Sequence, residues 1–126
     1  MSKAFLPGHE TWYASDSPAS EFSAVFEDDG ETGYFYACDR AGGGRVLDAV
    51  HVYSVRSVVD KDRQSLAEIV WSADGMKAAL LINDHADAVI DFAKRCSYCR
   101  SEFPSPASNW HRGEWSDQLM EDFRVE

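Results

Sequence analysis

Hydrophobic and polar side chains alternate from residue 22 onward, as they do along a half-buried β-strand. One face of this strand carries Phe22, Ala24 and Phe26. A two-residue turn at Asp29-Gly30, or a four-residue turn from Asp29 to Thr32, adds the apolar side chains Phe35 and Ala37 to that face. Either turn places Tyr34 and Tyr36 on the opposite face, beside Val25. The pattern therefore predicts a β-hairpin with a separate row of aromatic side chains on each face.

Further strand signals follow this hairpin. The glycine-rich residues 40–45 lead into residues 46–53, which are apolar on both faces and predict a central strand. Residues 66–72 and 77–82 flank Asp74-Gly75, which is a strong hairpin signal. A two-residue turn there pairs Ile69 with Leu80 and Trp71 with Ala78. Residues 11–14 fit an edge strand.

The hydrophobic period changes from two residues to about 3.6 at Asn83-Asp84. One stripe then carries the apolar side chains Ala86, Val89, Ile90 and Ala93. With Asn83 or Asp84 as the N-cap, this pattern predicts a helix from His85 to Cys96. Residues 97–115 contain Pro104 and Pro106 and predict a covering loop. A short helix from Asp117 to Phe123 is expected after Ser116 as its cap.

Together these elements predict a single α+β domain over residues 1–126. We expect an antiparallel sheet of five or six hairpin-connected strands, with one main helix packed on a face and a short C-terminal helix. The predicted core consists of Phe22, Phe26, Phe35, Val50, Val52, Ile69, Trp71, Leu80, Ile82, Val89 and Ile90.

The negative charge of the chain argues against two classes of partner, nucleic acids and anionic membranes. Its 22 acidic and 12 basic residues give a formal net charge of -10. Nucleic acids and anionic membrane surfaces are bound through clustered Lys and Arg, so neither is expected as a partner. The apolar run over residues 78–82 is too short to span a bilayer, and the first twelve residues lack the apolar run of a signal peptide. These features predict a cytoplasmic protein.

Two stretches resemble metal sites but lack essential ligands. The five carboxylates between Phe26 and Asp39 do not have the spacing of a calcium loop, because Gly30 and Thr32 fall on ligand positions. We expect those acidic side chains to point into water at a hairpin tip. Cys96 and Cys99 have the spacing of half a zinc site, with no second pair of the required type. The sequence thus predicts no metal and no cofactor.

The histidines and one aromatic loop carry the remaining candidate chemistry. Asp48 and His51 lie three residues apart on a strand, so their side chains point to opposite faces and do not form a dyad. His85 fits a helix start. The loop residues Trp110, His111 and Arg112 combine an aromatic ring, a titratable ring and a guanidinium, which are residue types common in binding sites.

We predict from these features a non-catalytic protein-binding or regulatory module. Its predicted binding residues are Tyr34, Tyr36, Trp110, His111 and Arg112, on a sheet surface that one helix leaves partly uncovered. The partner would be another protein, either a basic one, as the charge favours, or a second copy in a homodimer. The alternative is a small enzyme in which His51, His85 or His111 pairs with a carboxylate as acid and base.

Two consecutive strings, FEDDGETGYFYACD at residues 26–39 and RVLDAVHVYSV at residues 45–55, resemble the signature of a bacterial family of uncharacterised proteins, domain of unknown function 2251. The resemblance extends from about Phe22 to Asp84, although Cys38 stands where an aliphatic residue is expected. It implies a bacterial origin and a compact single domain, and it implies no activity.

Overall fold

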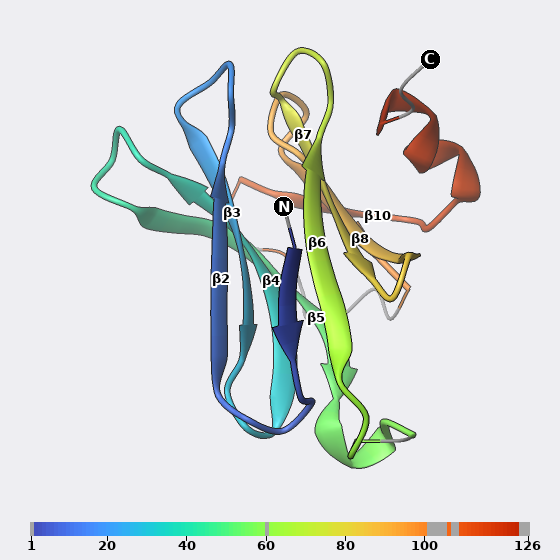
Figure 1. Cartoon of the computed structure of the whole chain (residues 1–126). Coiled ribbons are helices and arrows are strands. Elements are labelled where there is room, and N and C mark those ends of the chain that lie inside the picture. Colours follow the sequence, from blue (N-terminus) through green and yellow to red (C-terminus); the bar gives the residue numbers. More distant parts are fainter. Residues whose placement is uncertain (1, 60, 101–105, 107–108, 124–126) are drawn as a thin grey trace.

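The computed structural model describes residues 2–59, 61–100, 106 and 109–123, and this part of the chain forms two β-sheets packed face to face (Figure 1). The six-stranded sheet contains, in spatial order, β1 (Ser2–Phe5), β6 (Ser65–Trp71), β7 (Lys77–Ile82), β8 (His85–Asp91), β9 (Cys96–Cys99) and β10 (His111–Gly113). The four-stranded sheet contains β2 (Thr11–Asp16), β3 (Phe22–Asp28), β4 (Thr32–Asp39) and β5 (Arg45–Ser54).

The chain passes between the sheets twice before its last strand. After β1 it builds the whole four-stranded sheet by antiparallel hairpins, and the 3-10 helix η1 (Val55–Ser57) then leads back to the six-stranded sheet. All neighbouring strands are antiparallel except β10, which pairs in parallel with β9. The second 3-10 helix, η2 (Asp117–Phe123), follows β10.

The core lies between the two inner faces. Phe26, Phe35 and Val50 from the smaller sheet and Leu80 and Ile90 from the larger one are almost inaccessible to solvent. Six predicted core residues belong to the buried cluster, namely Phe26, Phe35, Val50, Ile69, Leu80 and Ile90. Four more pack against it in part: Phe22, Val52, Trp71 and Ile82. The predicted core omitted the large side chains Phe5, Phe92 and Trp110, which belong to the buried cluster.

Both predicted hairpins have the expected register. Phe26 lies opposite Phe35 and Val25 opposite Tyr36, across the four-residue turn in which the Asp29 N–H donates to the Thr32 carbonyl at 3.1 Å. Ile69 lies opposite Leu80 and Trp71 opposite Ala78, as predicted. That second loop is longer than the predicted two residues, because the strands separate after the hydrogen bond from the Ser72 N–H to the Lys77 carbonyl.

The predicted helix from His85 to Cys96 is wrong, because this segment forms β8, a turn and β9. Asn83 and Asp84 are not a helix cap. Their φ angles of 53° and 66° place both in the left-handed region, where they form a two-residue hairpin turn that brings Ile82 opposite His85. Val89 is buried although it alternates with the core residues Ala88 and Ile90, so β8 has apolar side chains on both faces. The apolar residues of such a strand follow one another so closely that their pattern can be mistaken for the apolar stripe of a helix.

The predicted α+β class is therefore also wrong: the described chain is mainly β, with no main helix on a sheet face. The single predicted sheet is replaced by two, and β5, which was expected to be central, lies at the edge of the smaller sheet. Its inner face packs near β8 and β9 of the other sheet. The expected edge strand is present as β2.

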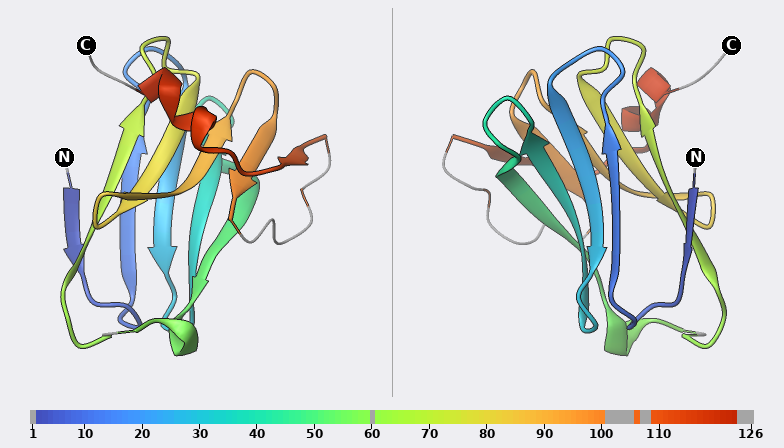
Figure 2. Two further views of the ribbon diagram at one scale, coloured as in Figure 1. Left: turned by 90° about the vertical axis from the view of Figure 1, so that its right-hand side faces the viewer. Right: turned by 60° about the vertical axis from the view of Figure 1, so that its left-hand side comes forward.

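The C-terminal region contains strand structure as well as the expected short helix. The predicted covering loop includes β9 residues and β10, while its residues 101–105 and 107–108 lie outside the described residues. Helix η2 has the predicted bounds, and the Gln118 N–H donates to Ser116 Oγ at 3.2 Å. Figure 2 shows η2 across the outer face of the six-stranded sheet, where Asp122 forms an ion pair with Lys77.

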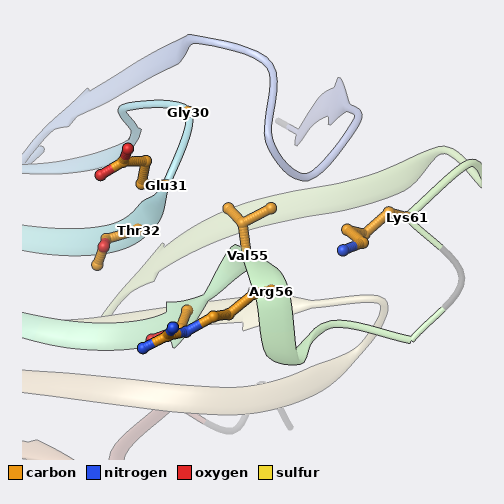
Figure 3. A pocket seen from close by; sticks show the side chains of 7 residues that line it. Gly30, Glu31, Thr32, Val55, Arg56 and Lys61 are labelled. Carbon is orange, nitrogen blue, oxygen red and sulfur yellow. The ribbon is translucent and has the colours of Figure 1, made fainter.

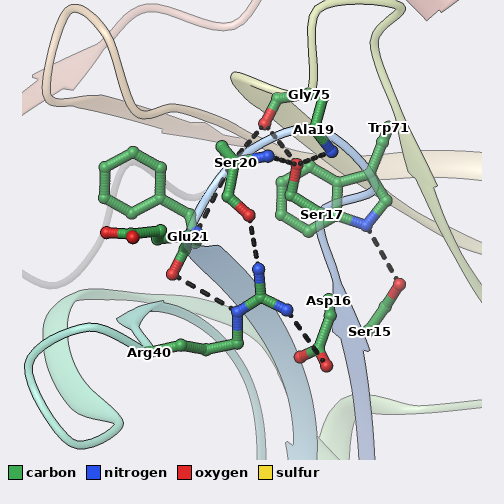
Figure 4. A network of polar contacts seen from close by, with 10 residues as sticks. Ser15, Asp16, Ser17, Ala19, Ser20, Glu21, Arg40, Trp71 and Gly75 are labelled. Atoms are coloured by element: carbon green, nitrogen blue, oxygen red, sulfur yellow. Dashed lines mark hydrogen bonds and ion pairs between the residues drawn. The ribbon is translucent and has the colours of Figure 1, made fainter.

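A polar network ties the β2–β3 loop of one sheet to the β6–β7 loop of the other (Figure 4). The hydroxyls of Ser17 and Ser20 donate to the Gly75 carbonyl at 2.8 and 2.9 Å. The Trp71 indole N–H donates to Ser15 Oγ at 3.0 Å. A Cβ on Gly75, whose φ is 71°, would lie 2.5 Å from Ser17 Oγ, so the close approach of the loops requires glycine there.

The left-handed turn at Asp84 gives a test that separates it from a helix cap. In the turn, Asp84→Gly should leave the free energy of unfolding unchanged or raise it by up to about 1 kcal/mol, whereas Asp84→Val should lower it by about 1–2 kcal/mol. Urea denaturation followed by far-UV circular dichroism measures both. A larger loss for the glycine variant than for the valine variant would contradict the turn.

Candidate binding face

The outer face of the four-stranded sheet carries a continuous group of aromatic side chains. One cross-strand row consists of Trp12, Glu27, Tyr34 and His51, one residue from each strand. Tyr36 lies in the adjacent row, opposite Val25. We call these five residues, Trp12, Glu27, Tyr34, Tyr36 and His51, the aromatic face. It exists because strict alternation along β3 and β4 sends their phenylalanines inward and these side chains outward.

The rings of the aromatic face contact one another in sequence. The ring centroids of Trp12 and Tyr36 are 6.3 Å apart, those of Tyr36 and Tyr34 5.8 Å, and those of Tyr34 and His51 6.1 Å. The Tyr36 hydroxyl donates to Glu27 Oε1 at 2.6 Å. Burial, followed by this hydrogen bond to a carboxylate, raises the pKa of Tyr36, so the phenol is neutral and acts as a fixed donor.

Trp12 is the most accessible member, with 61% of its surface exposed. It also forms one wall of a cleft of about 300 Å³ whose other lining residues are Glu10, Thr11, Glu27, Asp28 and Asp29. An exposed indole beside several carboxylates is an environment that favours a cation, through ring quadrupole and charge together.

Asp28 has a structural role at this cleft that the sequence did not predict. Its side chain was expected in water with the other acids of the turn, but the residue is 1% exposed. Its carboxylate accepts hydrogen bonds from the N–H groups of Gly8 and Gly30, both at 2.8 Å, and from the Tyr53 hydroxyl at 2.6 Å. Burial and this bond raise the pKa of Tyr53. Asp28 therefore fixes the turn that leads into the aromatic face.

The predicted binding residues separate into two groups in the structure. Tyr34 and Tyr36 stack on the outer face of the four-stranded sheet. Trp110 belongs to the core, where its ring packs edge-on against Phe92 at 6.1 Å. His111 is exposed on β10, and the side chain of Arg112, 8% exposed, lies beside Asp48. The structure thus does not bring Trp110 or Arg112 to the surface that carries the two tyrosines.

Arg112 and Asp48 form a buried ion pair between the two sheets. Arg112 Nη1 and Nη2 donate to the two Asp48 carboxylate oxygens at 2.8 and 3.3 Å, and Nη2 also donates to the Ala49 carbonyl at 3.3 Å. The side chains are 8% and 2% exposed. As predicted, Asp48 and His51 point to opposite faces of β5, since Asp48 meets Arg112 and His51 meets Tyr34.

The histidines have little of the geometry that acid–base catalysis needs. His51 Nε2 lies 3.3 Å from Ser54 Oγ. His85 Nδ1 lies 3.6 Å from Asp87 Oδ1 on the same strand, and burial raises the pKa of Asp87 despite the opposing effect of His85. The two cavities of about 530 and 550 Å³ have no histidine among their described lining residues.

The cavity of about 530 Å³ lies between the β3–β4 turn and the β5–η1 junction (Figure 3). Arg56 and Lys61 supply its positive charges, Thr32 and Ser54 its hydroxyls, and Val55 is its one apolar side chain among the described residues. Glu31 adds a negative charge to the same lining, so the cavity has no single charge preference, and we do not assign it a function.

Within residues 2–59, 61–100, 106 and 109–123, no group of three or more His, Cys, Asp or Glu side chains is arranged to hold a metal ion. Cys38, Cys96 and Cys99 are free thiols. Over the same ranges, no helix has both the length and the apolar character needed to cross a membrane.

Trp12 is the main residue of the aromatic face that sequence reasoning missed. Residues 11–14 were expected to form an edge strand, yet no role was given to their side chains. The signal was present in the alternation of this strand, because Tyr13 packs against the core and Trp12 must then point outward.

Comparison with known proteins confirms the family resemblance. Residues 5–124 match the model of a family described as "Uncharacterized protein conserved in bacteria (DUF2251)". A relative from Haemophilus influenzae, described as "Uncharacterized protein", is 41% identical over 105 residues. The aligned region covers 81% of this chain and 65% of the relative, so the chain spans about two-thirds of that protein's length. No solved structure matches.

The Asp48–Arg112 pair predicts a large effect on stability. Arg112→Met removes the guanidinium from a buried carboxylate and should lower the free energy of unfolding by about 3–5 kcal/mol, while the double variant Asp48→Leu/Arg112→Met should recover most of the loss. Urea denaturation measures both. The exposed Arg63→Gln is the control and should change stability by less than about 0.5 kcal/mol. Equal losses in the single and double variants would show that the charge is not the cause.

Proposed function

The chain belongs to this family of uncharacterised bacterial proteins, and we propose from its geometry that it is a non-catalytic protein-binding module of the bacterial cytoplasm. Its partner is a protein that presents a basic segment. The binding surface is the aromatic face together with the acidic cleft beside Trp12.

The observation that carries this proposal is the uncovered stack of rings on the outer face of the four-stranded sheet. The two sheets differ in this respect, because η2 crosses the outer face of the six-stranded sheet and no described segment crosses the aromatic face (Figure 2). Trp and Tyr are enriched in the centres of protein interfaces, where they bury a large area with few rotatable bonds. An exposed Trp12 in contact with Tyr36 has this character.

The charges around the rings favour a cationic partner. Glu10, Glu27 and Asp29 line the cleft next to Trp12, and the chain has a formal net charge of -10. An Arg or Lys side chain in this cleft would stack on the indole and lie close to the carboxylates. Net charge of this size also accelerates encounter with a basic protein at low salt.

The two alternatives receive less support. A second copy would bring two acidic rims together, and the resulting repulsion opposes a homodimer on this face. An enzyme would need a histidine and a carboxylate from different strands in a cleft, whereas the His85–Asp87 pair lies on a single strand.

Loss of Trp12 should weaken partner binding while the fold is kept. Cross-linking in the native cell, followed by mass spectrometry, should recover a protein with a basic segment from the wild-type chain. With the recovered protein purified, Trp12→Ala should weaken binding at least about tenfold in calorimetric titration, as expected for a central interface aromatic. The affinity should also fall as salt rises, because exposed charges are screened.

Leu66→Ala supplies the matched control, since Leu66 is also exposed, at 46%, but lies in the other sheet. It should bind as the wild type does. A partner that Trp12→Ala retains at full affinity, or that both variants lose equally, would refute binding at the aromatic face. Recovery of a second copy of the chain as the cross-linked species would favour the homodimer instead.

A further inference from the structure

A second potential ligand site lies at one end of the sandwich, away from the aromatic face. It is a cavity of about 550 Å³, formed where the start of β3 and the β4–β5 connection approach the β8–β9 turn and the residues before β10. This volume is within the range of small-molecule sites in proteins. Its lining combines three aromatic side chains, Phe22, Phe92 and Trp110, with two arginines, Arg45 and Arg95.

The aromatic lining is held in place by the core. Phe92 stacks on Phe22 with centroids 4.5 Å apart and planes 14° apart, and it also stacks on Trp71 at 5.8 Å. Trp110 meets Phe92 edge-on. Phe92 and Trp110 are only 4% and 7% exposed, so most of each ring is fixed by packing and one part reaches the cavity. Such a wall suits a flat apolar ligand and needs little reorganisation to receive it.

The arginines give the cavity a local charge opposite to that of the whole chain. The Arg45 side chain is 70% exposed, and its Nη2 lies 4.0 Å from the carboxylate of Asp39, the one acidic residue among the described lining residues. Asp39 Oδ1 already accepts the Ala41 N–H at 3.0 Å. Among the described residues, no carboxylate lies within ion-pair distance of Arg95. The described lining therefore carries two arginines and one partly engaged carboxylate.

The backbone at Arg95 has an unusual conformation beside the cavity. Arg95 has a φ of 53°, in the left-handed region that non-glycine residues rarely adopt. Its carbonyl accepts the His111 N–H at 2.8 Å, which connects the β8–β9 turn to β10 beside the cavity. Asn109, a further lining residue, has a φ of 72°. Strained backbone of this kind is concentrated at functional sites, and here two such residues line one cavity.

We propose that this cavity binds a small organic anion with a flat apolar body, such as an aromatic carboxylate. The rings of Phe22, Phe92 and Trp110 contact the apolar body, and the guanidiniums of Arg45 and Arg95 bind the carboxylate through charge-assisted hydrogen bonds. The site is independent of the proposed protein-binding function, because it shares no lining residue with the aromatic face or its cleft.

Titration with 2-naphthoate, followed by amide chemical shifts in NMR spectra, tests the proposal. Saturable shifts should be centred on Phe92, Arg95 and Trp110. The double variant Arg45→Gln/Arg95→Gln should weaken naphthoate binding at least about tenfold, because each charge-assisted hydrogen bond contributes on that scale. The neutral analogue 2-naphthamide should bind more weakly to the wild type, and the double variant should change its affinity by less than about twofold.

Three further variants make the outcome decisive. Arg63→Gln removes an exposed arginine elsewhere and should leave naphthoate binding unchanged, as should Trp12→Ala. Val46→Trp adds a large ring from a rim position that is 53% exposed, and it should block both probes. Absence of saturable shifts at the cavity, equal affinity of the wild type for the two probes, or equal losses in the Arg63 and double variants would overturn the proposal.

Discussion

Strict alternation of side chains along β3 and β4 is the constraint on which the rest of the structure depends. Phe26 and Phe35 face the other sheet and are almost inaccessible, while Glu27 and Tyr36 face outward and bond to each other. A shift of register by one residue would exchange these two sets and expose the core. The same pairing that buries the phenylalanines therefore assembles the tyrosines, so stability and the candidate binding face share one cause.

Two buried carboxylates secure the ends of this arrangement. Asp28 accepts two backbone N–H groups and the Tyr53 hydroxyl at the β3–β4 turn. Asp48 binds Arg112 across the sandwich. Each burial is tolerated because the charge is met by several donors in fixed positions. Of the 22 acidic residues in the chain, Asp28 and Asp48 stabilise the interior, whereas Glu10 and Asp29 give the cleft beside Trp12 its negative charge.

Local patterns in the sequence predicted which strands pair in hairpins, but they did not predict that the strands form two packed sheets. The registers of β3–β4 and β6–β7 follow from alternation and turn residues within a dozen positions. Strand β8 is buried on one face by the other sheet and on the opposite face by the C-terminal region. Both covering segments are distant in sequence, so the residues of β8 and their near neighbours do not reveal that it is a strand. The same limit applies to the site: Tyr34 and Tyr36 were predicted, whereas Trp12 joins them only through the β2–β3 pairing, and Trp110 enters the core through contacts with distant residues.

The parallel strand β10 has a consequence for how the protein folds during synthesis. All the antiparallel pairs are complete once the chain has been made as far as Cys99, and each consists of neighbours in sequence except β1 with β6. Arg112 meets Asp48 across a separation of 64 residues, and it is synthesised after every residue of the antiparallel pairs. Such a non-local contact forms late and slowly. Until β10 is made, Asp48 lacks this guanidinium and β9 is the edge of its sheet, so one short strand supplies both the buried ion pair and the last pairing of the larger sheet.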